Sequence, residues 1–582
     1  MASIDELFKK PNLPTGSLKR KLEIPDAQEA YKSTKINGHS SPNGRHANGG
    51  VPVEDVADDG EVEAGPDLPP EDGEEEERFF GGGVTKDAAE ALEYLDQHDG
   101  GEDLVEEKID SSWLRRLANT FEKKVTKNAE LRARYETEPQ KFMASEADLD
   151  AEIKSWSLLS EHPTLYPEFA QSEALPQLVG LLAHENTDIA IAAIEIVSEL
   201  LDEDVQAEQE DWDALVASLL DADLLQLLMS NLTRLDEDNE ADRSGVYHSL
   251  SVLESLAGQQ SVAERIGHVN VLLWLCNRLN RREDSITQNK QYAAEVLQVL
   301  LQSSSLLRVR LASEVDGVDL FLQLLAAYRK RDPPKGSTEE EYAENLFDAL
   351  TCVVDEPLGK TKLLEAEGVE LMLIMLKDGN FSKLRALRLV DHACGGNGKA
   401  SVEVCEKLVD AAGLKTVFRM FMKKTDGATL EHIVGIFASL LRLLPGESAA
   451  RIRTLAKFAE KGHEKVSKLV DLRQSYARRV GTVDKEIRGE RAAMSAGEVE
   501  QRNDEWFSRR LEGGLYVLQT LDIILAWLYA EDPSAKSIIT KLVGVETVSD
   551  SLREQMAELG PAAEGVDGDT QEMLRTLVDC LQ

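Results

Sequence analysis

Two short stretches of the sequence combine residue types that could bind a metal ion or a phosphate group. Asp391-His392-Ala393-Cys394, followed by Cys405, offers metal-ligating side chains but lacks the paired short spacing of a zinc site. Gly395-Gly396-Asn397-Gly398-Lys399-Ala400 is glycine-rich, but it follows a predicted helix and lacks the serine or threonine that completes a phosphate-binding loop. We therefore expect no metal, no cofactor and no enzymatic activity, and we interpret His392 as an interior helix histidine.

A different chemistry is available from carboxylates that recur in similar predicted helices. The segment from Glu344 to Val354 has apolar residues at three- and four-residue steps, which predicts a helix with one buried face and one acidic face. Aligning the similar segments by their terminal apolar pairs places four carboxylates and one serine at one equivalent position: Glu195, Ser251, Glu295, Asp348 and Asp391. We call the four carboxylates the acidic column.

The acidic column suits a partner that carries positive charge. A row of carboxylates can bind the Lys and Arg side chains of an extended peptide through charge-assisted hydrogen bonds. Solvation of the helices, or ion pairs between neighbouring repeats, would produce the same pattern. We take Glu195, Glu295, Asp348 and Asp391 as the predicted partner-binding residues.

The helices that must position the column repeat along the chain. Amphipathic helices are predicted at residues 189–201, 245–257, 289–302, 344–354, 384–393 and 429–443. Each follows a shorter apolar motif, and these motifs start about every 45 to 50 residues, close to the armadillo and HEAT period. Gly317, Gly368 and Gly413 begin three of the motifs and are expected to permit a tight turn. Since a single repeat cannot bury its apolar face, the sequence predicts an all-α, armadillo/HEAT-like, right-handed superhelical solenoid with a groove.

The predicted repeats occupy residues 167–445, between two helical caps. Residues 111–166 are expected to form the N-terminal cap, with Ser111 and Ser112 capping its first helix. Residues 446–582 are expected to form the C-terminal cap, which includes a short acidic linker. Its long helices are predicted at residues 449–461, 464–488 and 504–529.

Residues 1–110 have the composition of a disordered tail. They contain clustered Gly, Pro, Ser and Asn and almost no apolar periodicity. Lys19, Arg20 and Lys21 resemble a nuclear-localisation signal, and an acidic block follows from Val51 to Glu77. The tail therefore predicts entry into the nucleus.

Charge and cysteine usage narrow the possible partners and compartment. A net charge of −42 repels phosphate backbones and attracts basic segments, so we expect no direct nucleic-acid binding. The five cysteines are odd in number and far apart, which is typical of buried thiols in a reducing compartment. The sequence shows neither a signal peptide nor a run long enough to cross a bilayer, so we expect a soluble intracellular protein with no membrane partner.

Several segments are more specific than a general armadillo pattern. They are Phe121-Glu122-Lys123-Lys124, Lys127-Asn128-Ala129-Glu130-Leu131-Arg132, Lys141-Phe142-Met143, Asp148-Leu149-Asp150, His184-Glu185-Asn186-Thr187-Asp188-Ile189, Glu344-Asn345-Leu346-Phe347-Asp348, Leu389-Val390-Asp391-His392-Ala393 and Arg509-Arg510-Leu511-Glu512-Gly513-Gly514-Leu515-Tyr516-Val517-Leu518-Gln519. Over residues 111–530 the sequence resembles the spliceosome-associated beta-catenin-like armadillo proteins. The resemblance implies a nuclear scaffold that acts in pre-mRNA splicing. Its implied partners are basic segments of splicing factors, including the Myb-like spliceosomal scaffold. Whether the chain forms homo-oligomers is left open.

Two other classes of armadillo protein are alternatives. A karyopherin-like nuclear import adaptor would carry a ladder of Trp-x-x-x-Asn motifs, but Trp274 is followed by Arg278 where that motif needs Asn. A catenin of adhesion or signalling would need a basic groove for an acidic ligand, which the net charge disfavours.

Overall fold

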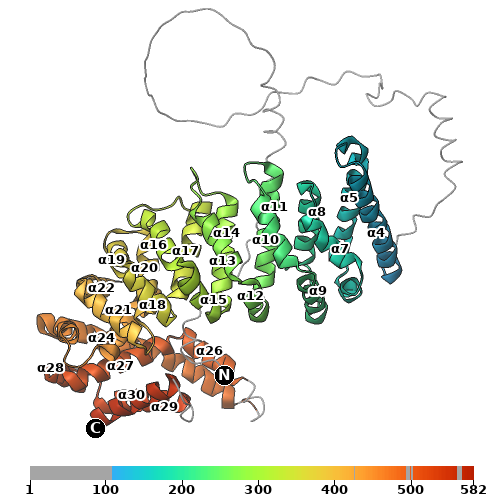
Figure 1. The fold of residues 1–582 in the computed structure, drawn as a ribbon. Helices are drawn as coiled ribbons and strands as arrows, with labels where there is room; N and C mark the ends of the chain where they lie inside the picture. Colours follow the sequence, from blue (N-terminus) through green and yellow to red (C-terminus); the bar gives the residue numbers. More distant parts are fainter. Residues whose placement is uncertain (1–107, 425, 493, 495–498, 500–501, 560–565) are drawn as a thin grey trace, which may run out of the picture. The chain divides into compact units, whose positions relative to one another are not determined.

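A computed structural model describes residues 108–424, 426–492, 494, 499, 502–559 and 566–582 (Figure 1). Every regular element in these ranges is helical, and the fold is an all-α stack of armadillo-like repeats. The predicted localisation signal Lys19-Arg20-Lys21 and the acidic block from Val51 to Glu77 lie outside the described residues.

The first described helix, α4 (Ser111–Arg134), is capped by the residue before it. The Asp110 Oδ1 atom accepts hydrogen bonds from the backbone N–H groups of Ser112 (2.9 Å) and Trp113 (3.1 Å). The predicted serine cap is therefore wrong, because the carboxylate of Asp110 already satisfies the free N–H groups of the first turn. The elements that follow are η1 (Pro139–Lys141), α5 (Met143–Lys154), η2 (Ser155–Glu161), η3 (Pro163–Leu165) and α6 (Tyr166–Ala170).

In each repeat, two or more shorter elements precede one longer helix. The shorter elements are α7 (Ala174–Gly180), η4 (Leu181–Ala183), α9 (Gln209–Asp221), α10 (Leu224–Arg234), α12 (Gln260–Ile266), α13 (Val269–Asn280), α15 (Ser305–Arg310), the π-helical turn η5 (Leu311–Val315), α16 (Gly317–Leu325), η6 (Ala326–Tyr328), α18 (Pro357–Glu365), α19 (Gly368–Asp378), α21 (Lys399–Asp410) and α22 (Gly413–Met422). The longer helices are α8 (Thr187–Leu200), α11 (Glu240–Ala257), α14 (Gln288–Ser303), α17 (Thr338–Val353), α20 (Phe381–Cys394) and α23 (Gly427–Leu443).

The longer helices pack against one another in sequence order. α5 contacts α8, and the contacts continue through α11, α14, α17, α20 and α23 to α27 (Leu515–Glu531). We call this succession of helices the row. The six predicted amphipathic helices all correspond to helices of the row.

The row helices begin earlier than their apolar periodicity indicates. Asn186, Asn239, Ser337 and Asp426 occupy the residue before α8, α11, α17 and α23, and each side chain accepts a hydrogen bond from a backbone N–H group of the first turn. These caps start each helix in a polar turn, before the first buried position. Residues 332–336 form a loop, and α17 starts directly after its Ser337 cap.

The glycines at the repeat turns serve close packing. The left-handed backbone conformation at these turns lies one residue before each glycine, at Asp316, Glu367 and Ala412. A Cβ atom on Gly317 would lie 2.6 Å from the Leu311 side chain, and one on Gly368 would lie 2.3 Å from that of Leu363. Glycine is needed there because any side chain would collide with the preceding helix.

The C-terminal region contains α24 (Ala449–Ala492), α26 (Asn503–Glu512), α27, α28 (Pro533–Leu542), α29 (Val545–Glu558) and α30 (Val566–Cys580). α24 breaks at Glu460–His463, as the two separate helix predictions require. The single helix predicted over residues 504–529 is wrong, because Gly514 adopts a φ of 97° and divides α26 from α27. A Cβ atom on Gly514 would also lie 2.5 Å from the Tyr476 ring.

The core is continuous along the repeats and includes four of the cysteines. Cys276, Cys352, Cys394 and Cys405 are buried as predicted, whereas Cys580 is exposed. A buried ion pair joins Arg473 of α24 to Asp522 of α27, which is fully buried. Of the helices described, none is by itself long and apolar enough to cross a membrane, although two bent helix pairs reach that length and composition.

Candidate functional site

The row presents all four carboxylates of the acidic column at partly exposed positions. Glu195 lies on α8, Glu295 on α14, Asp348 on α17 and Asp391 on α20. The structure therefore brings the predicted residues onto successive helices of one packed layer. Their immediate partners differ from helix to helix.

Three of the carboxylates reach forward to the next helix of the row. The Oε1 atom of Glu195 lies 3.7 Å from Nε2 of His248, and the Oδ1 atom of Asp348 accepts a 2.7 Å hydrogen bond from Nη1 of Arg388. Nδ1 of His432 lies 3.1 Å from the Oδ2 atom of Asp391. These contacts are the pairing between repeats that the sequence left open as an alternative to peptide binding.

The partner side chains form a second column that the sequence analysis missed. His248 and Arg388 each lie three residues before the aligned column position of their own helix, Ser251 and Asp391. Residues three apart share a helix face. A hydrogen-bond donor three residues before the column position is therefore the sequence pattern that could have revealed these partners. We call His248, Arg388 and His432 the donor column.

At the N-terminal end of the row, carboxylates outnumber cations. The group that we call the N-terminal cluster consists of Asp150, Lys154, Glu195 and Glu199. Lys154 Nζ forms a 2.7 Å ion pair with Asp150 Oδ2. Burial raises the pKa of Glu195, and the nearby charges of Asp150 and Glu199 raise it further, whereas Lys154 lowers it. The cluster thus contains three carboxylates and one ammonium group.

The other partners of this cluster are electrically neutral. The Glu199 Oε1 atom accepts hydrogen bonds from the hydroxyl groups of Ser157 (2.6 Å) and Ser160 (3.2 Å). Burial lowers the pKa of His248 to about 4, so the imidazole beside Glu195 is uncharged at pH 7. The cluster therefore keeps an excess of negative charge.

Farther along the row, arginines stand opposite the carboxylates. The C-terminal cluster, by our definition, consists of Glu344, Asp348, Arg385, Arg388, Asp391 and His432. Arg388 pairs with Asp348, and Arg385 contacts Glu344. Burial raises the pKa of Asp348, and the charges of Arg388 and Arg385 oppose that rise. A cavity of about 340 Å³ adjoins this cluster and is also lined by Leu384, whose side chain is 50% exposed.

Glu295 lies between the two clusters. Its Oε2 atom accepts a 3.3 Å hydrogen bond from the Gln291 amide of the same helix. On the next helix, α17, Asn345 lies three residues before Asp348, which is the donor-column offset, and its Nδ2 atom is buried without a hydrogen-bond partner among the described residues. At the donor offset, the helix after Glu295 therefore carries an amide, whereas the helix after Asp348 carries the guanidinium of Arg388.

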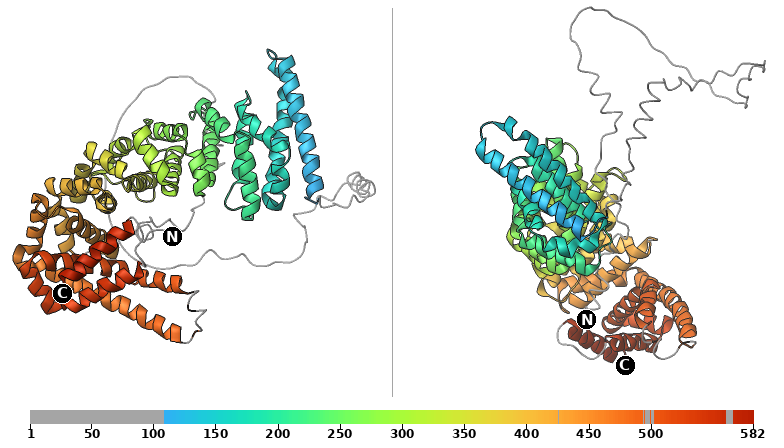
Figure 2. Two further views of the ribbon diagram at one scale, coloured as in Figure 1. Left: turned by 60° about the horizontal axis from the view of Figure 1, so that its bottom comes forward. Right: turned by 90° about the vertical axis from the view of Figure 1, so that its right-hand side faces the viewer.

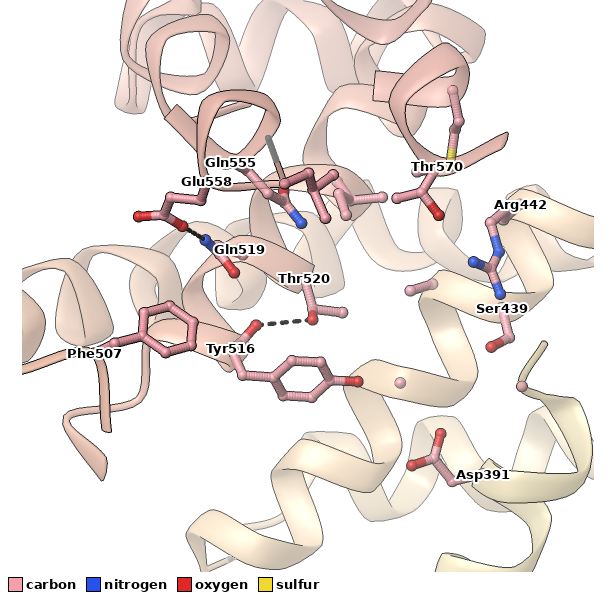
Figure 3. A pocket seen from close by; sticks show the side chains of 16 residues that line it. Asp391, Ser439, Arg442, Phe507, Tyr516, Gln519, Thr520, Gln555, Glu558 and Thr570 are labelled. Carbon is pink, nitrogen blue, oxygen red and sulfur yellow. Dashed lines mark hydrogen bonds between the residues drawn. The ribbon is translucent and has the colours of Figure 1, made fainter. Parts of the chain in front are cut away.

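A second cavity, of about 130 Å³, lies where the row meets the C-terminal helices (Figure 3). Asp391 and Arg442 line it from the row, and Tyr516, Gln519 and Glu558 line it from α27 and α29. Gln519 Nε2 donates to Glu558 at 2.8 Å across this wall. The cavity wall thus combines an arginine, carboxylates and a phenol.

The stretch that resembled a metal site is a structural contact. His392 is buried, and its Nδ1 atom lies 2.9 Å from Asp355 Oδ1. The interior position predicted for His392 is confirmed. No group of three or more His, Cys, Asp or Glu side chains in the described part of the chain is arranged to hold a metal ion.

A family model matches most of the chain, including the repeats. The model of the family described as "Catenin-beta-like, Arm-motif containing nuclear" matches residues 89–556. The chain belongs to this catenin-beta-like family. The predicted family resemblance is confirmed, and the match extends across both clusters of the row.

Curated relatives from distant organisms are similar over most of their length. The Beta-catenin-like protein 1 homolog of Schizosaccharomyces pombe is 36% identical over 487 residues, which are 82% of this chain and 84% of that protein. Beta-catenin-like protein 1 of Homo sapiens is 36% identical over 432 residues, which are 72% of this chain and 76% of that protein.

Solved structures with a similar arrangement have low sequence identity. One is a crystal structure of an engineered protein, with a TM-score of 0.46 and 16% identity over 79% of this chain and 98% of that chain. Another comes from work on a phosphorylation switch that controls the interaction between cadherin and beta-catenin. Its TM-score is 0.42 at 13% identity, over 81% of this chain and 98% of that chain.

Proposed function

We propose that this chain is a non-enzymatic nuclear scaffold that binds basic, nuclear-localisation-type segments of splicing factors and acts in pre-mRNA splicing. The description of the family as nuclear supports the location, and the resemblance to spliceosome-associated beta-catenin-like proteins supports the process. The Myb-like spliceosomal scaffold is the partner that this resemblance implies.

The excess of carboxylates in the N-terminal cluster is the observation that carries the proposal. Asp150 and Glu199 repel the charge of Glu195, and Lys154, the one cation of the cluster, pairs with Asp150. A Lys or Arg side chain from a partner would relieve that repulsion and would replace water around half-buried carboxylates with charge-assisted hydrogen bonds. We therefore place the strongest basic contact at α5 and α8, with Glu295 on α14 as the next contact along the row.

Asp348 and Asp391 have a different role in this proposal. Since Arg388 and His432 already occupy them, a basic peptide would have to displace a side chain of the protein itself. We assign these two carboxylates mainly to the pairing between repeats. The long-range field of a chain with net charge −42 still draws basic partners toward the whole surface.

Entry into the nucleus is proposed to depend on Lys19, Arg20 and Lys21. A reporter fused to residues 1–60 should accumulate in nuclei, and changing all three residues to Ala should abolish that accumulation. A mutant tail that still concentrates in nuclei would contradict this assignment.

Affinity purification of the tagged full-length chain from nuclear extract, with and without RNase, tests the scaffold proposal. Splicing proteins should be recovered in both samples, because the proposed contacts are between proteins. Loss of those proteins after RNase treatment would contradict the proposal. Recovery of nuclear import factors alone would favour the karyopherin-like alternative.

A further inference from the structure

The second part of α24 and α26 form a helical hairpin with an unusual distribution of charge. The two helices contact each other, and they extend away from the neighbouring helices (Figure 2). α24 contains many Lys and Arg residues after its break at Glu460–His463, although the whole chain carries a net charge of −42. The hairpin is therefore a local basic region of an acidic protein.

Acidic side chains of α24 are neutralised within the hairpin. Arg510 Nε of α26 pairs with Asp484 Oδ1 at 3.0 Å, and Arg509 Nη1 pairs with Glu490 Oε1 at 2.7 Å. The indole N–H group of Trp506 also donates to Glu490 at 2.8 Å. These contacts use carboxylates of α24 to hold α26 in place.

Three cations on the outer side of α24 remain available to solvent. Arg478, Lys485 and Arg488 are exposed, and none of them lies within 4.0 Å of a carboxylate in the described ranges. They lie within a sector of about 80° of the helix, since each residue advances by about 100°. Gly481 lies in the same sector, and a Cβ atom there would meet nothing within 4 Å. We call Arg478, Lys485 and Arg488 the basic stripe.

We propose that the basic stripe binds an acidic segment of a partner protein. The stripe rises about 15 Å along the helix axis, which is the length of about five residues of extended peptide. Its exposed cations match a run of Asp, Glu or phosphorylated side chains in charge, and the absence of a side chain at Gly481 lets a peptide backbone approach the helix. This site is separate from the row and does not depend on the function proposed for the row.

An acidic protein segment fits the stripe better than RNA does. Single-stranded RNA binding depends on exposed aromatic rings on which bases stack. On this hairpin, Tyr476 and Trp506 are buried, and Phe507 lines the cavity near α27. The negative field of the whole chain also opposes a long polyanion more strongly than a short acidic peptide.

Fluorescence anisotropy with the full-length chain tests the stripe. The probe is a fluorescein-labelled oligoglutamate peptide, and a labelled uridine oligonucleotide serves as the RNA comparison. At low salt, the variant Arg478→Glu/Lys485→Glu/Arg488→Glu should bind the peptide about tenfold more weakly than the original chain, because three favourable contacts become repulsive. Raising the salt concentration should reduce the difference.

A charge-matched variant separates the stripe from the effect of net charge. Lys123→Glu/Lys335→Glu/Lys377→Glu alters three exposed lysines outside the hairpin by the same total charge and should leave the affinity nearly unchanged. Thermal unfolding of both variants should match the original chain, and an Arg478→Ala/Lys485→Ala/Arg488→Ala variant repeats the test with less repulsion. The proposal would be overturned if the stripe variants bound the peptide as tightly as the original chain does. It would also be overturned if the stripe bound the oligonucleotide more tightly than the peptide.

Discussion

The N-terminal and C-terminal clusters belong to the same row of helices, and they use their carboxylates in different ways. The N-terminal cluster has three carboxylates and one cation, Lys154, which pairs with Asp150, and the histidine beside Glu195 is neutral at pH 7. In the C-terminal cluster, Arg385 and Arg388 stand opposite Glu344 and Asp348. The comparison teaches that a repeated carboxylate leaves negative charge on the surface only where the donor column of the next helix lacks a cation.

Acid should lower the free energy of unfolding through His248, which lies beside the N-terminal cluster. This is the largest change in stability that we predict. The folded-state pKa of His248 is about 4 against an ordinary value of 6.5, so between these values the unfolded chain binds a proton that the folded chain does not. The contribution of the neutral His248 to the free energy of unfolding is therefore fully present above pH 6.5 and is lost as the pH falls toward 4. At pH 5 the loss is about 2 kcal/mol relative to pH 7.5.

Urea unfolding at the two pH values measures this contribution. The variant His248→Gln removes the titrating group and should show a pH-dependent loss smaller by about 2 kcal/mol. An identical loss in the variant would show that His248 does not become protonated on unfolding in this range.

Removal of a carboxylate should cost more in the C-terminal cluster than in the N-terminal cluster. Asp348→Ala leaves the half-buried guanidinium of Arg388 without its carboxylate and should destabilise the protein by about 1 to 2 kcal/mol. Glu195→Ala removes a charge that two neighbouring carboxylates repel, so its cost should stay below about 0.5 kcal/mol. Denaturant midpoints of the two variants give the comparison directly, and equal costs would contradict the distinction between the clusters.

A glycine opposite Asp391 offers a steric test of the C-terminal cluster. A Cβ atom on Gly435 would lie 2.3 Å from Asp391 Oδ1, so Gly435→Ala must displace the carboxylate that contacts His432. We expect a destabilisation of about 1 kcal/mol. The matched control is Gly481→Ala, where a Cβ atom meets nothing within 4 Å. That change should stabilise the protein by about 0.5 to 1 kcal/mol through helix propensity, with thermal unfolding as the measurement.

The row could be predicted from the sequence because apolar spacing and repetition identify amphipathic helices directly. The predicted segment from Glu344 to Val354 corresponds to α17, but α17 begins at Thr338. Apolar spacing does not predict this first part of the helix, because a polar cap, Ser337, sets its start. The position of Gly317 and Gly368 at the start of a motif predicts a turn there. The need for glycine comes from Leu311 and Leu363, which only the packed structure brings against them.

The candidate site was only partly visible in the sequence. Helix spacing predicts that Glu195 and Asp348 lie on one layer, but their neighbours His248 and Arg388 belong to the next helix of the row. The neutrality of His248 follows from burial, which no local pattern reports. Glu199 follows Glu195 by one helical turn, which the sequence shows, but its partner Ser157 belongs to η2 and only the packed structure brings the two together.

The central claim is that basic segments bind over the N-terminal cluster, and peptide titration of paired variants tests it most directly. A labelled lysine- and arginine-rich peptide is titrated at two salt concentrations against Glu195→Gln/Glu199→Gln and against Asp348→Asn/Asp391→Asn, each compared with the unchanged full-length chain. The first variant should bind about threefold to tenfold more weakly at low salt, with a smaller difference at high salt. The second should bind within about twofold of the unchanged chain, because its carboxylates are already paired. An equal loss in both variants, or a larger loss in the second, would contradict the account.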